Sequence, residues 1–202
     1  MSAEGQSRPG REALYGDETL HGDETLCADV GASNVRVGLA DGGRVARLAE
    51  RRIQDLLVEH PDDIVVAIAE MIAAMKALLP AGAAAAGPVG IGVPAIVSED
   101  GSLRVGLRSG IPGGPALRQR LSQHLGTEVV VDNDASLAAL GEAIFGAGQG
   151  ERHIALLTLG TNIGMGVVVD ERVYRGARGA AGEIGTVPVW LAPSDALRWE
   201  LI

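Results

Sequence analysis

Two glycine-containing turns have residue types that can bind anions. Gly31-Ala32-Ser33 and Gly160-Thr161-Asn162 each combine backbone N–H groups with a hydroxyl side chain, and each lies between two short apolar segments. Because N–H groups and hydroxyls donate hydrogen bonds to phosphates, two such turns that face each other could hold one nucleotide between two lobes. Glycine is also common in β-hairpin turns for conformational reasons alone, and this second interpretation stays open.

Acidic and amide side chains at a few positions could act on a substrate. Asp29 lies in a short apolar strand, where burial of an unpaired carboxylate would be costly, and this favours a functional role. Asp134 begins a predicted helix, so its default role is an N-cap worth about 1 kcal/mol. By default, Asn133 and Asp132 are turn residues. Glu183 lies among glycines and alanines, where a carboxylate is by default a solvated surface charge.

The elements that would position these residues alternate between strands and helices. Strands are predicted over residues 26–31, 34–40, 44–53, 89–93 and 128–131, with a hairpin over 96–105. A helix is predicted from Ile64 to just before Pro80, because apolar residues recur there at helical spacing after the acidic pair Asp62 and Asp63. Two more helices are predicted over 115–125 and 135–145. After the glycine-rich residues 146–150 the opening pattern repeats, with strands over 153–159, 164–170 and 172–174.

The chain divides by composition into three parts. Residues 1–25 are polar and contain a short duplication, which predicts a flexible leader. Residues 26–148 then form a lobe of the order β-β-β-α-β-α-β-α, and residues 149–202 begin a second lobe with the same opening strands. The sequence therefore predicts an α/β protein.

Charge and composition exclude several classes of function. The 17 basic and 26 acidic residues give a net charge of −9, which disfavours direct binding of nucleic acid. The single cysteine, Cys27, cannot form an internal disulfide or a thiolate metal cage, which is typical of a cytoplasmic protein. The longest apolar stretch, 64–79, is interrupted by Glu70 and Lys76 and is too short to cross a membrane. Lys76 is also the only lysine, so a P-loop is excluded.

Five motifs occur in an order that resembles the ROK family of sugar kinases and sugar-responsive repressors. They lie in residues 28–38, 90–94, 131–142, 158–166 and 174–185, and the resemblance extends over residues 26–189. It implies the actin-like ATPase fold, which is ribonuclease H-like and of the hexokinase type. Family members are longer than this chain, so the second lobe is expected to be incomplete.

The resemblance also implies an activity, the ATP-dependent phosphorylation of a hexose hydroxyl, with glucose as the expected sugar. Asp134 matches the family's general base, and Asn133 and Glu183 match its sugar-binding residues. Asp29 matches the acidic residue that organises Mg²⁺ and its waters. The residues that match the two phosphate-binding turns are Gly31, Ala32, Ser33, Asn34, Gly160, Thr161 and Asn162.

The sequence departs from the family pattern at three places that bear on these roles. Ala32 replaces a glycine, and a positive φ there would cost roughly 1 kcal/mol or more. Asn162 also replaces a glycine, and asparagine is the least costly substitute in the left-handed region. Thr186 stands where many members have histidine, and the cysteines of their zinc site are missing, so no zinc site is expected.

Two alternatives to a kinase stay open. The first is a sugar-responsive transcriptional regulator, because repressors of the family share this body and tolerate changes in the phosphate-binding turns, as at Ala32. Residues 1–25 are, however, too short and acidic for the upstream helix-turn-helix of such proteins. The chain could also be a catalytically inactive fragment. Family members are often dimers, which makes a homodimer a candidate assembly beside the hexose and the nucleotide as partners.

Overall fold

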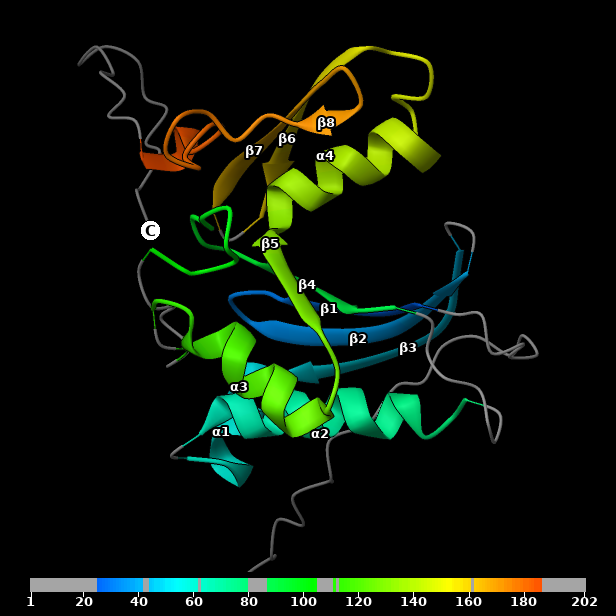
Figure 1. Ribbon diagram of the computed structural model, residues 1–202, viewed down its shortest axis with the longest axis vertical. Helices are drawn as coiled ribbons and strands as arrows, with labels where there is room; N and C mark the ends of the chain where they lie inside the picture. Colours follow the sequence, from blue (N-terminus) through cyan, green and yellow to red (C-terminus); the bar gives the residue numbers. More distant parts are fainter. Residues whose placement is uncertain are drawn as a thin grey trace, which may run out of the picture.

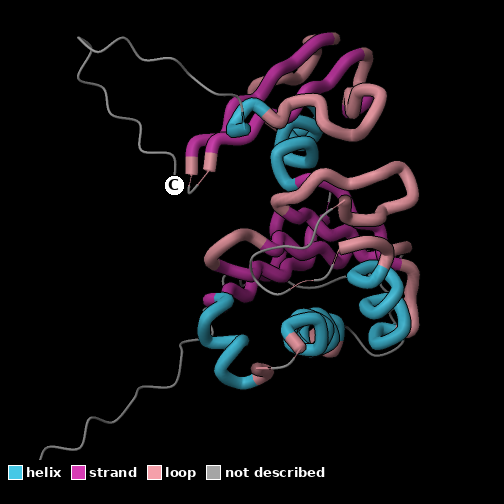
Figure 2. Tube along the Cα trace, turned by 90° about the vertical axis from the view of Figure 1, so that its left-hand side faces the viewer, coloured by secondary structure: helices cyan, strands magenta, loops and turns pink. Residues whose placement is uncertain are grey.

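The computed structural model describes residues 25–41, 44–61, 63–79, 87–104, 111, 113–160 and 162–186, which form two β-sheets and the helices packed on them (Figure 1). The predicted leader, apart from Thr25, lies outside the described residues, as do Thr161 and residues 187–202. A view turned by 90° shows the layers in order: helices, first sheet, one helix, second sheet (Figure 2).

The first sheet has five strands in the order β3-β2-β1-β4-β5. Its strands are β1 (Thr25–Val30), β2 (Asn34–Asp41), β3 (Arg44–Arg52), β4 (Val89–Val93) and β5 (Val129–Asn133). The first three form the predicted antiparallel meander, and β4 and β5 extend it in parallel with β1. Because β1, β4 and β5 are parallel, their carboxyl ends lie at one edge of the sheet, where α/β proteins commonly bind ligands.

Two predicted helices, α2 (Ile64–Lys76) and α3 (Ala116–Leu125), pack on one face of this sheet and against each other (Figure 1). The side chain of Asp63 caps α2 by accepting a hydrogen bond from the Val65 N–H at 3.1 Å, and it also pairs with Arg120 of α3. The apolar side of α2 is buried with the inward-facing residues of the sheet in one continuous core. Residues of this core lie next to the ends of β1 and β5, where Asp29 and Asn133 are found, and Asp134 follows directly at the start of α4.

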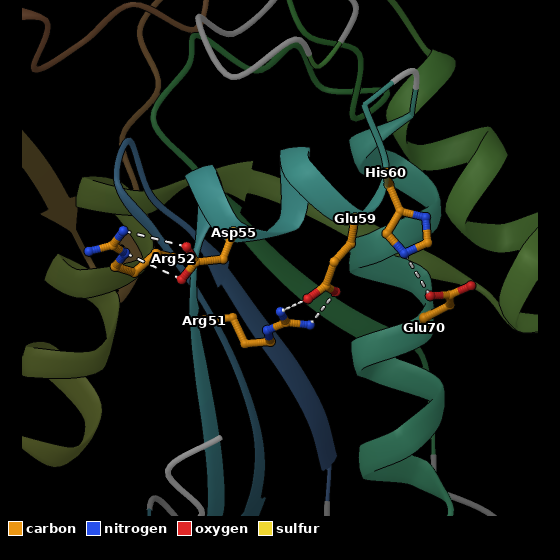
Figure 3. Close-up of polar contacts among 6 residues, drawn as sticks. All are labelled: Arg51, Arg52, Asp55, Glu59, His60 and Glu70. Carbon is orange, nitrogen blue, oxygen red and sulfur yellow. Dashed lines mark hydrogen bonds and ion pairs between the residues drawn. The ribbon is translucent and has the colours of Figure 1, made fainter. Parts of the chain in front are cut away.

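A short helix, α1 (Ile53–Glu59), was not predicted by the sequence, which assigned Ile53 to the third strand. No side chain caps its N-terminus, and Ile53 and Leu56 are buried in the core, so tertiary packing stabilises the helix. Exposed ion pairs also connect it to its surroundings, as Figure 3 shows. These pairs are Arg51–Glu59 at 2.5 Å, Arg52–Asp55 at 3.3 Å and, beyond the helix, His60–Glu70 at 3.0 Å. Such surface pairs contribute little to stability, because solvent screens the charges.

The second sheet repeats the opening of the first, as the sequence predicts. The strands β6 (His153–Leu159), β7 (Ile163–Val169) and β8 (Arg172–Val173) form an antiparallel meander in the order β6-β7-β8. Helix α4 (Asp134–Phe145) lies between the two sheets and packs mainly on β6 and β7 (Figures 1 and 2). Helix α4 therefore connects the strand end at β5 to the second sheet.

The bounds of the other predicted strands and helices agree with the structure to within a few residues. The predicted hairpin over 96–105 is present as a tight turn closed by a bridge between Val97 and Leu103, and Val105 lies outside the described residues. A single turn of 3-10 helix over Ile184–Thr186 follows the loop after β8. No helix among the described residues is long and apolar enough to cross a membrane. The predicted boundary between lobes at residues 148 and 149 stays a prediction.

Candidate functional site

Three carboxylates from three distant segments meet where the two sheets approach each other. Asp29 is the next-to-last residue of β1, Asp134 is the first residue of α4, and Glu183 follows β8. Burial raises the pKa of Asp134, and the negative charge of Asp29 raises it further. Burial likewise raises the pKa of Glu183, with a further contribution from the charge of Asp134. Asp134 thus lies close enough to Asp29 to be affected by its charge, and Glu183 lies close enough to Asp134.

Sheet register explains why Asp29 and Asp134 come together. Asp29 lies beside Gly92 of β4, and Gly92 lies beside Asp132 of β5. A Cβ atom at Gly92 would be 3.6 Å from the Cα of Asp134, so the backbone of β4 passes close to the start of α4. The predicted acidic and amide residues at the ends of β1 and β5 therefore belong to one edge of the sheet.

The side chain of Asp29 differs from the sequence prediction. It is 46% exposed rather than buried, and it pairs at 3.3 Å with Arg36, its cross-strand neighbour on β2. Arg36 also pairs with Glu50 at 3.0 Å. The argument from the cost of burying an unpaired carboxylate is therefore wrong for Asp29. Its assignment to magnesium then depends on its position beside Asp134 and the first turn.

The cap of α4 also differs from the prediction. Asn133, rather than Asp134, is the N-cap: its Oδ1 accepts a hydrogen bond from the Ser136 N–H at 2.9 Å, and its Nδ2 donates to the Ala95 carbonyl at 3.1 Å. Asp134 is the first helical residue and accepts from the Ala135 N–H at 2.7 Å. Since an amide carries two N–H groups, Asn133 keeps one donor for a substrate hydroxyl.

Asp132 was expected to be a turn residue, but it lies in β5 and is buried. Its Oδ1 accepts from the Asn133 N–H at 2.9 Å, and its Oδ2 pairs with Arg175, which follows β8. Sequence reasoning missed this pair, because Asp132 and Arg175 are 43 residues apart and no local pattern connects them.

Glycines on and beside β7 set the position of Glu183. A Cβ atom at Gly182 would overlap the carbonyl oxygen of Met165, and one at Gly185 would overlap that of Ile163. Gly182 also has a φ of +88°, which residues with a side chain rarely adopt. The two glycines that flank Glu183 therefore allow this segment to lie directly against the backbone of β7.

Helix α4 also packs on β7, and small residues line this contact. A Cβ atom at Gly166 would be 2.6 Å from the Cβ of Ala139, and one at Gly164 would be 3.3 Å from the Cβ of Ala135. Close approach of α4 to β7 therefore requires glycine at both strand positions. Because α4 begins at Asp134, the contact also sets the position of that carboxylate relative to Glu183.

Each glycine turn is closed by a hydrogen bond from the N–H of its glycine, but the first turn encloses two residues and the second encloses one. In the first, the Gly31 N–H donates to the Asn34 carbonyl at 2.9 Å; in the second, the Gly160 N–H donates to the Asn162 carbonyl at 3.1 Å. Ala32 and Asn162 both have negative φ, so neither position carries the strain considered from the sequence. The N–H groups of Ala32 and Ser33 donate to no other described residue and could donate to a phosphate.

The donor set available for magnesium is small. No group of three or more histidine, cysteine or acidic side chains in the described part of the chain could hold a metal ion. Mg²⁺ in phosphoryl-transfer sites is usually held by one or two carboxylates, water and the substrate phosphates. Asp29, exposed and two residues before the first turn, fits a magnesium ion of this kind.

A cavity of about 570 Å³ lies between residues 97–104 and residues 175–179, and Asp29, Asn133, Asp134 and Glu183 are not among the residues that line it. Arg104, Arg175 and Arg178 contribute to its walls, and the Arg104 Nη1 donates to the Arg178 carbonyl at 3.1 Å across it. The segment that leads to Glu183 is thus in contact with the hairpin that follows β4.

Comparison with known proteins agrees with the resemblance seen in the motifs. Residues 25–194 match the ROK family. The chain is 35% identical to a glucokinase of Thermotoga maritima over 164 residues, which cover 80% of this chain and 49% of that protein. It therefore spans about half the length of this curated relative.

Solved structures give the same result for the fold. A ROK family glucokinase from Streptomyces griseus, in complex with glucose and AMPPNP, superposes with a TM-score of 0.66 and 30% identity over 83% of this chain and 51% of that chain. A ROK family transcriptional regulator, a homologue of the E. coli MLC protein, superposes with a TM-score of 0.62 and 25% identity over 79% and 40%. The predicted actin-like ATPase fold is confirmed.

Proposed function

Because this chain belongs to the ROK family, we propose that it transfers the terminal phosphoryl group of ATP to a hydroxyl of a hexose, with Asp134 as the general base. The observation that carries the proposal is the position of Asp134. It begins α4 beside the ends of β1 and β4, near Asp29, and α4 packs on β7, against which the segment of Glu183 also lies. A nucleotide and a sugar would bind on opposite sides of Asp134.

In the proposed reaction Asp134 accepts the proton of the attacking sugar hydroxyl. The hydroxyl oxygen forms a bond to the γ-phosphorus as the bond from that phosphorus to the bridging oxygen breaks, and ADP leaves. The raised pKa of Asp134 makes its carboxylate a better proton acceptor than an ordinary aspartate. Asp134 is held at the first turn of α4, so it has little freedom to move away from the hydroxyl.

Asn133 and Glu183 would orient the hexose. The free N–H of the Asn133 amide can donate to a hydroxyl, and the Glu183 carboxylate can accept from two hydroxyls. Both residues are held by backbone contacts, Asn133 as the cap of α4 and Glu183 between two glycines packed on β7. We propose glucose as the preferred hexose, since the similar proteins of Thermotoga maritima and Streptomyces griseus are glucokinases.

The nucleotide would lie between the two glycine turns. The backbone N–H groups of Ala32 and Ser33 would donate to its phosphates from the first turn, and residues 161 and 162 would do so from the second. The complex of the similar Streptomyces griseus protein with AMPPNP supports ATP as the donor. Asp29 would hold Mg²⁺ through water, and the bound ion would neutralise charge on the β- and γ-phosphates.

Release of ADP by the purified chain with Mg-ATP and a panel of hexoses tests the proposal. Turnover should depend on the hexose and should fall by about 10²-fold or more in Asp134→Asn, which keeps the size of the side chain but removes the base. Asp55→Asn is the matched control, because Asp55 also lies in the first turn of a helix and its pair with Arg52 is exposed. Equal turnover in the wild type and in Asp134→Asn would rule out Asp134 as the base.

A sugar-responsive regulator is the second candidate function, favoured by the similarity to the homologue of the E. coli MLC protein. A regulator of this type would bind a hexose through Asn133 and Glu183 without needing Asp134 as a base. Calorimetric titration of the chain with glucose in the absence of ATP, together with the ADP-release assay, separates the two candidates. Glucose binding without ATP turnover would favour the regulator.

A further inference from the structure

We infer that the ion pair between Arg175 and Asp132 is a positioning device that sets the distance between the sugar-binding segment at Glu183 and the strand end at Asn133 and Asp134. The effect on the hexose rests on the proposed function. The pair connects the loop that follows β8 in the second sheet to β5 of the first sheet. Neither residue would touch the substrate.

Asp132 is suited to this role because its charge is buried and both its oxygens are engaged. Its side chain is only 12% exposed. One oxygen accepts from the Asn133 N–H at 2.9 Å, and the other pairs with Arg175. A buried carboxylate needs a cationic partner and hydrogen bonds, and Arg175 is the cation that pairs with it among the described residues. Asp132 therefore ties the backbone at Asn133 to the side chain of Arg175.

Arg175 continues the connection toward Glu183. Its backbone carbonyl accepts a hydrogen bond from the Ala181 N–H at 3.1 Å, which closes the loop immediately before Gly182 and Glu183. The side chain of Arg175 thus reaches β5 while its backbone braces the segment that carries the glutamate. Displacement of this one side chain would move two sugar-binding positions relative to each other.

Two other contacts fix the loop after β8, but they join it to the hairpin after β4 and not to β5. The Arg104 Nη1 donates to the Arg178 carbonyl at 3.1 Å, and a Cβ atom at Gly179 would be 2.7 Å from the Val97 carbonyl oxygen. Both contacts tie the loop to the hairpin that follows β4, on the far side of the cavity of about 570 Å³. The Arg175–Asp132 pair differs from them because it joins the loop to β5, at the residue directly before Asn133.

The chemistry of the pair specifies arginine. The planar guanidinium offers several fixed donors to a carboxylate, whereas a lysine would supply a flexible point charge. A lysine at position 175 would keep the charge balance but lose the fixed geometry. Because hydrogen bonds weaken steeply with distance and misalignment, loss of geometry alone should weaken hexose binding.

The experiment compares Arg175→Met, Asp132→Asn, their double variant and Arg175→Lys with the wild type. Asp132→Asn keeps the shape of the side chain and an acceptor for the Asn133 N–H, and it leaves no buried charge, so it remains informative if Arg175→Met folds poorly. Arg152→Met is the matched control, since it breaks the exposed pair with Asp170 in the second sheet, away from this loop. Two quantities are measured: glucose affinity without ATP, by calorimetry, and amide hydrogen exchange of residues 176–184.

Each single variant should bind glucose about tenfold more weakly or worse, and residues 176–184 should exchange faster. The double variant should bind glucose no more weakly than the worse single variant, because the two side chains act as one unit. Arg175→Lys should recover only part of the affinity, and Arg152→Met should match the wild type.

Unchanged exchange at residues 176–184 in both Arg175→Met and Asp132→Asn would overturn the inference. Faster exchange with unchanged glucose affinity would overturn it as well, because the pair would then hold the loop without positioning the sugar. If the wild type binds neither glucose nor another hexose, the proposed function fails. The exchange measurement alone then decides whether the pair holds the loop.

Discussion

At the scale of single residues, the candidate site brings together charges that repel one another. Burial and the charge of Asp29 raise the pKa of Asp134, and burial and the charge of Asp134 raise the pKa of Glu183. A carboxyl group whose pKa is higher in the folded than in the unfolded state favours folding when it is protonated. Its contribution is fully present below the ordinary value, 3.8 for Asp134, and is lost as the pH rises through the raised pKa.

We therefore expect Asp134→Asn to be more stable than the wild type at pH 7, although it should lose activity. The neutral amide avoids the cost of holding an ionised carboxylate beside Asp29 in a partly buried position. Because Asp134 is only partly buried, solvent screens part of this cost, and a small rise in Tm is expected.

Thermal melts of wild type and variant at pH 7 and below pH 4 check this prediction. The difference in Tm should shrink at the lower pH, where the wild-type carboxyl group is protonated as well. Asp55→Asn serves again as the control and should show no such rise, since it removes an exposed ion pair. A lower Tm for Asp134→Asn at pH 7 would show that the charge stabilises the fold.

At the scale of elements, β7 is the strand on which the site is assembled. Helix α4 packs on Gly164 and Gly166, and the segment around Glu183 packs on the carbonyl groups of Ile163 and Met165. Small residues at these contacts allow backbones to approach where a methyl group would force them apart. The glycines of β7 and of the segment after β8 thus act in packing, and the positions of Asp134 and Glu183 follow from it.

Gly182→Ala should accordingly weaken hexose binding by more than tenfold. The new methyl group would overlap the Met165 carbonyl oxygen, and the backbone at a φ of +88° would be strained, so the segment must move away from β7 and carry Glu183 with it. Equilibrium dialysis with labelled glucose, together with a thermal melt of each variant, measures the effect.

Gly126→Ala is the matched control for backbone strain. Gly126 has a φ of +62° at the end of α3, but no atom lies within 4 Å of the position its Cβ would take. This variant should lose about 1 kcal/mol of stability and keep its affinity for glucose. If Gly182→Ala binds glucose as tightly as the wild type, the close contact at Gly182 does not determine the position of Glu183.

At the scale of the whole molecule, the two sheets differ in how much apolar surface they bury. The continuous core is built from β1–β5 and the helices α1–α3. In the second sheet, Val168 is the one apolar side chain among the described residues of β6–β8 that is fully buried. Leu157, Leu159 and Ile163 are 52%, 76% and 45% exposed. Hydrophobic burial therefore stabilises the first sheet more than the second.

This difference predicts two levels of protection in native-state hydrogen exchange. Amides of β6 and β7 should exchange through local opening well before those of β1, β4 and β5, which should exchange only with global unfolding. Exchange measured by mass spectrometry in native buffer distinguishes the two sheets. Equal protection of β6 and β4 would show that surface not described here, or a partner, stabilises the second sheet.

The sequence by itself determined the order of strands and helices, the repeated meander and the residues from which the site is built. These follow from local patterns: apolar alternation in β2, helical spacing in α2, and glycine turns after β1 and β6. The family motifs added the roles expected of Asp134, Asn133 and Glu183. Local patterns were sufficient for these features because each depends on residues close together in the chain.

Only the tertiary structure decided how those residues are used. It placed Asp29 at an exposed strand end, made Asn133 the cap of α4, and paired Asp132 with Arg175 across 43 residues. It also formed α1, whose short helix depends on burial of Ile53 and Leu56. The Asp132–Arg175 pair and the hydrogen bond from the Asn133 amide to the Ala95 carbonyl join segments far apart in the chain. Burial, charge and hydrogen-bond partners depend on how the elements pack, which local sequence patterns do not specify.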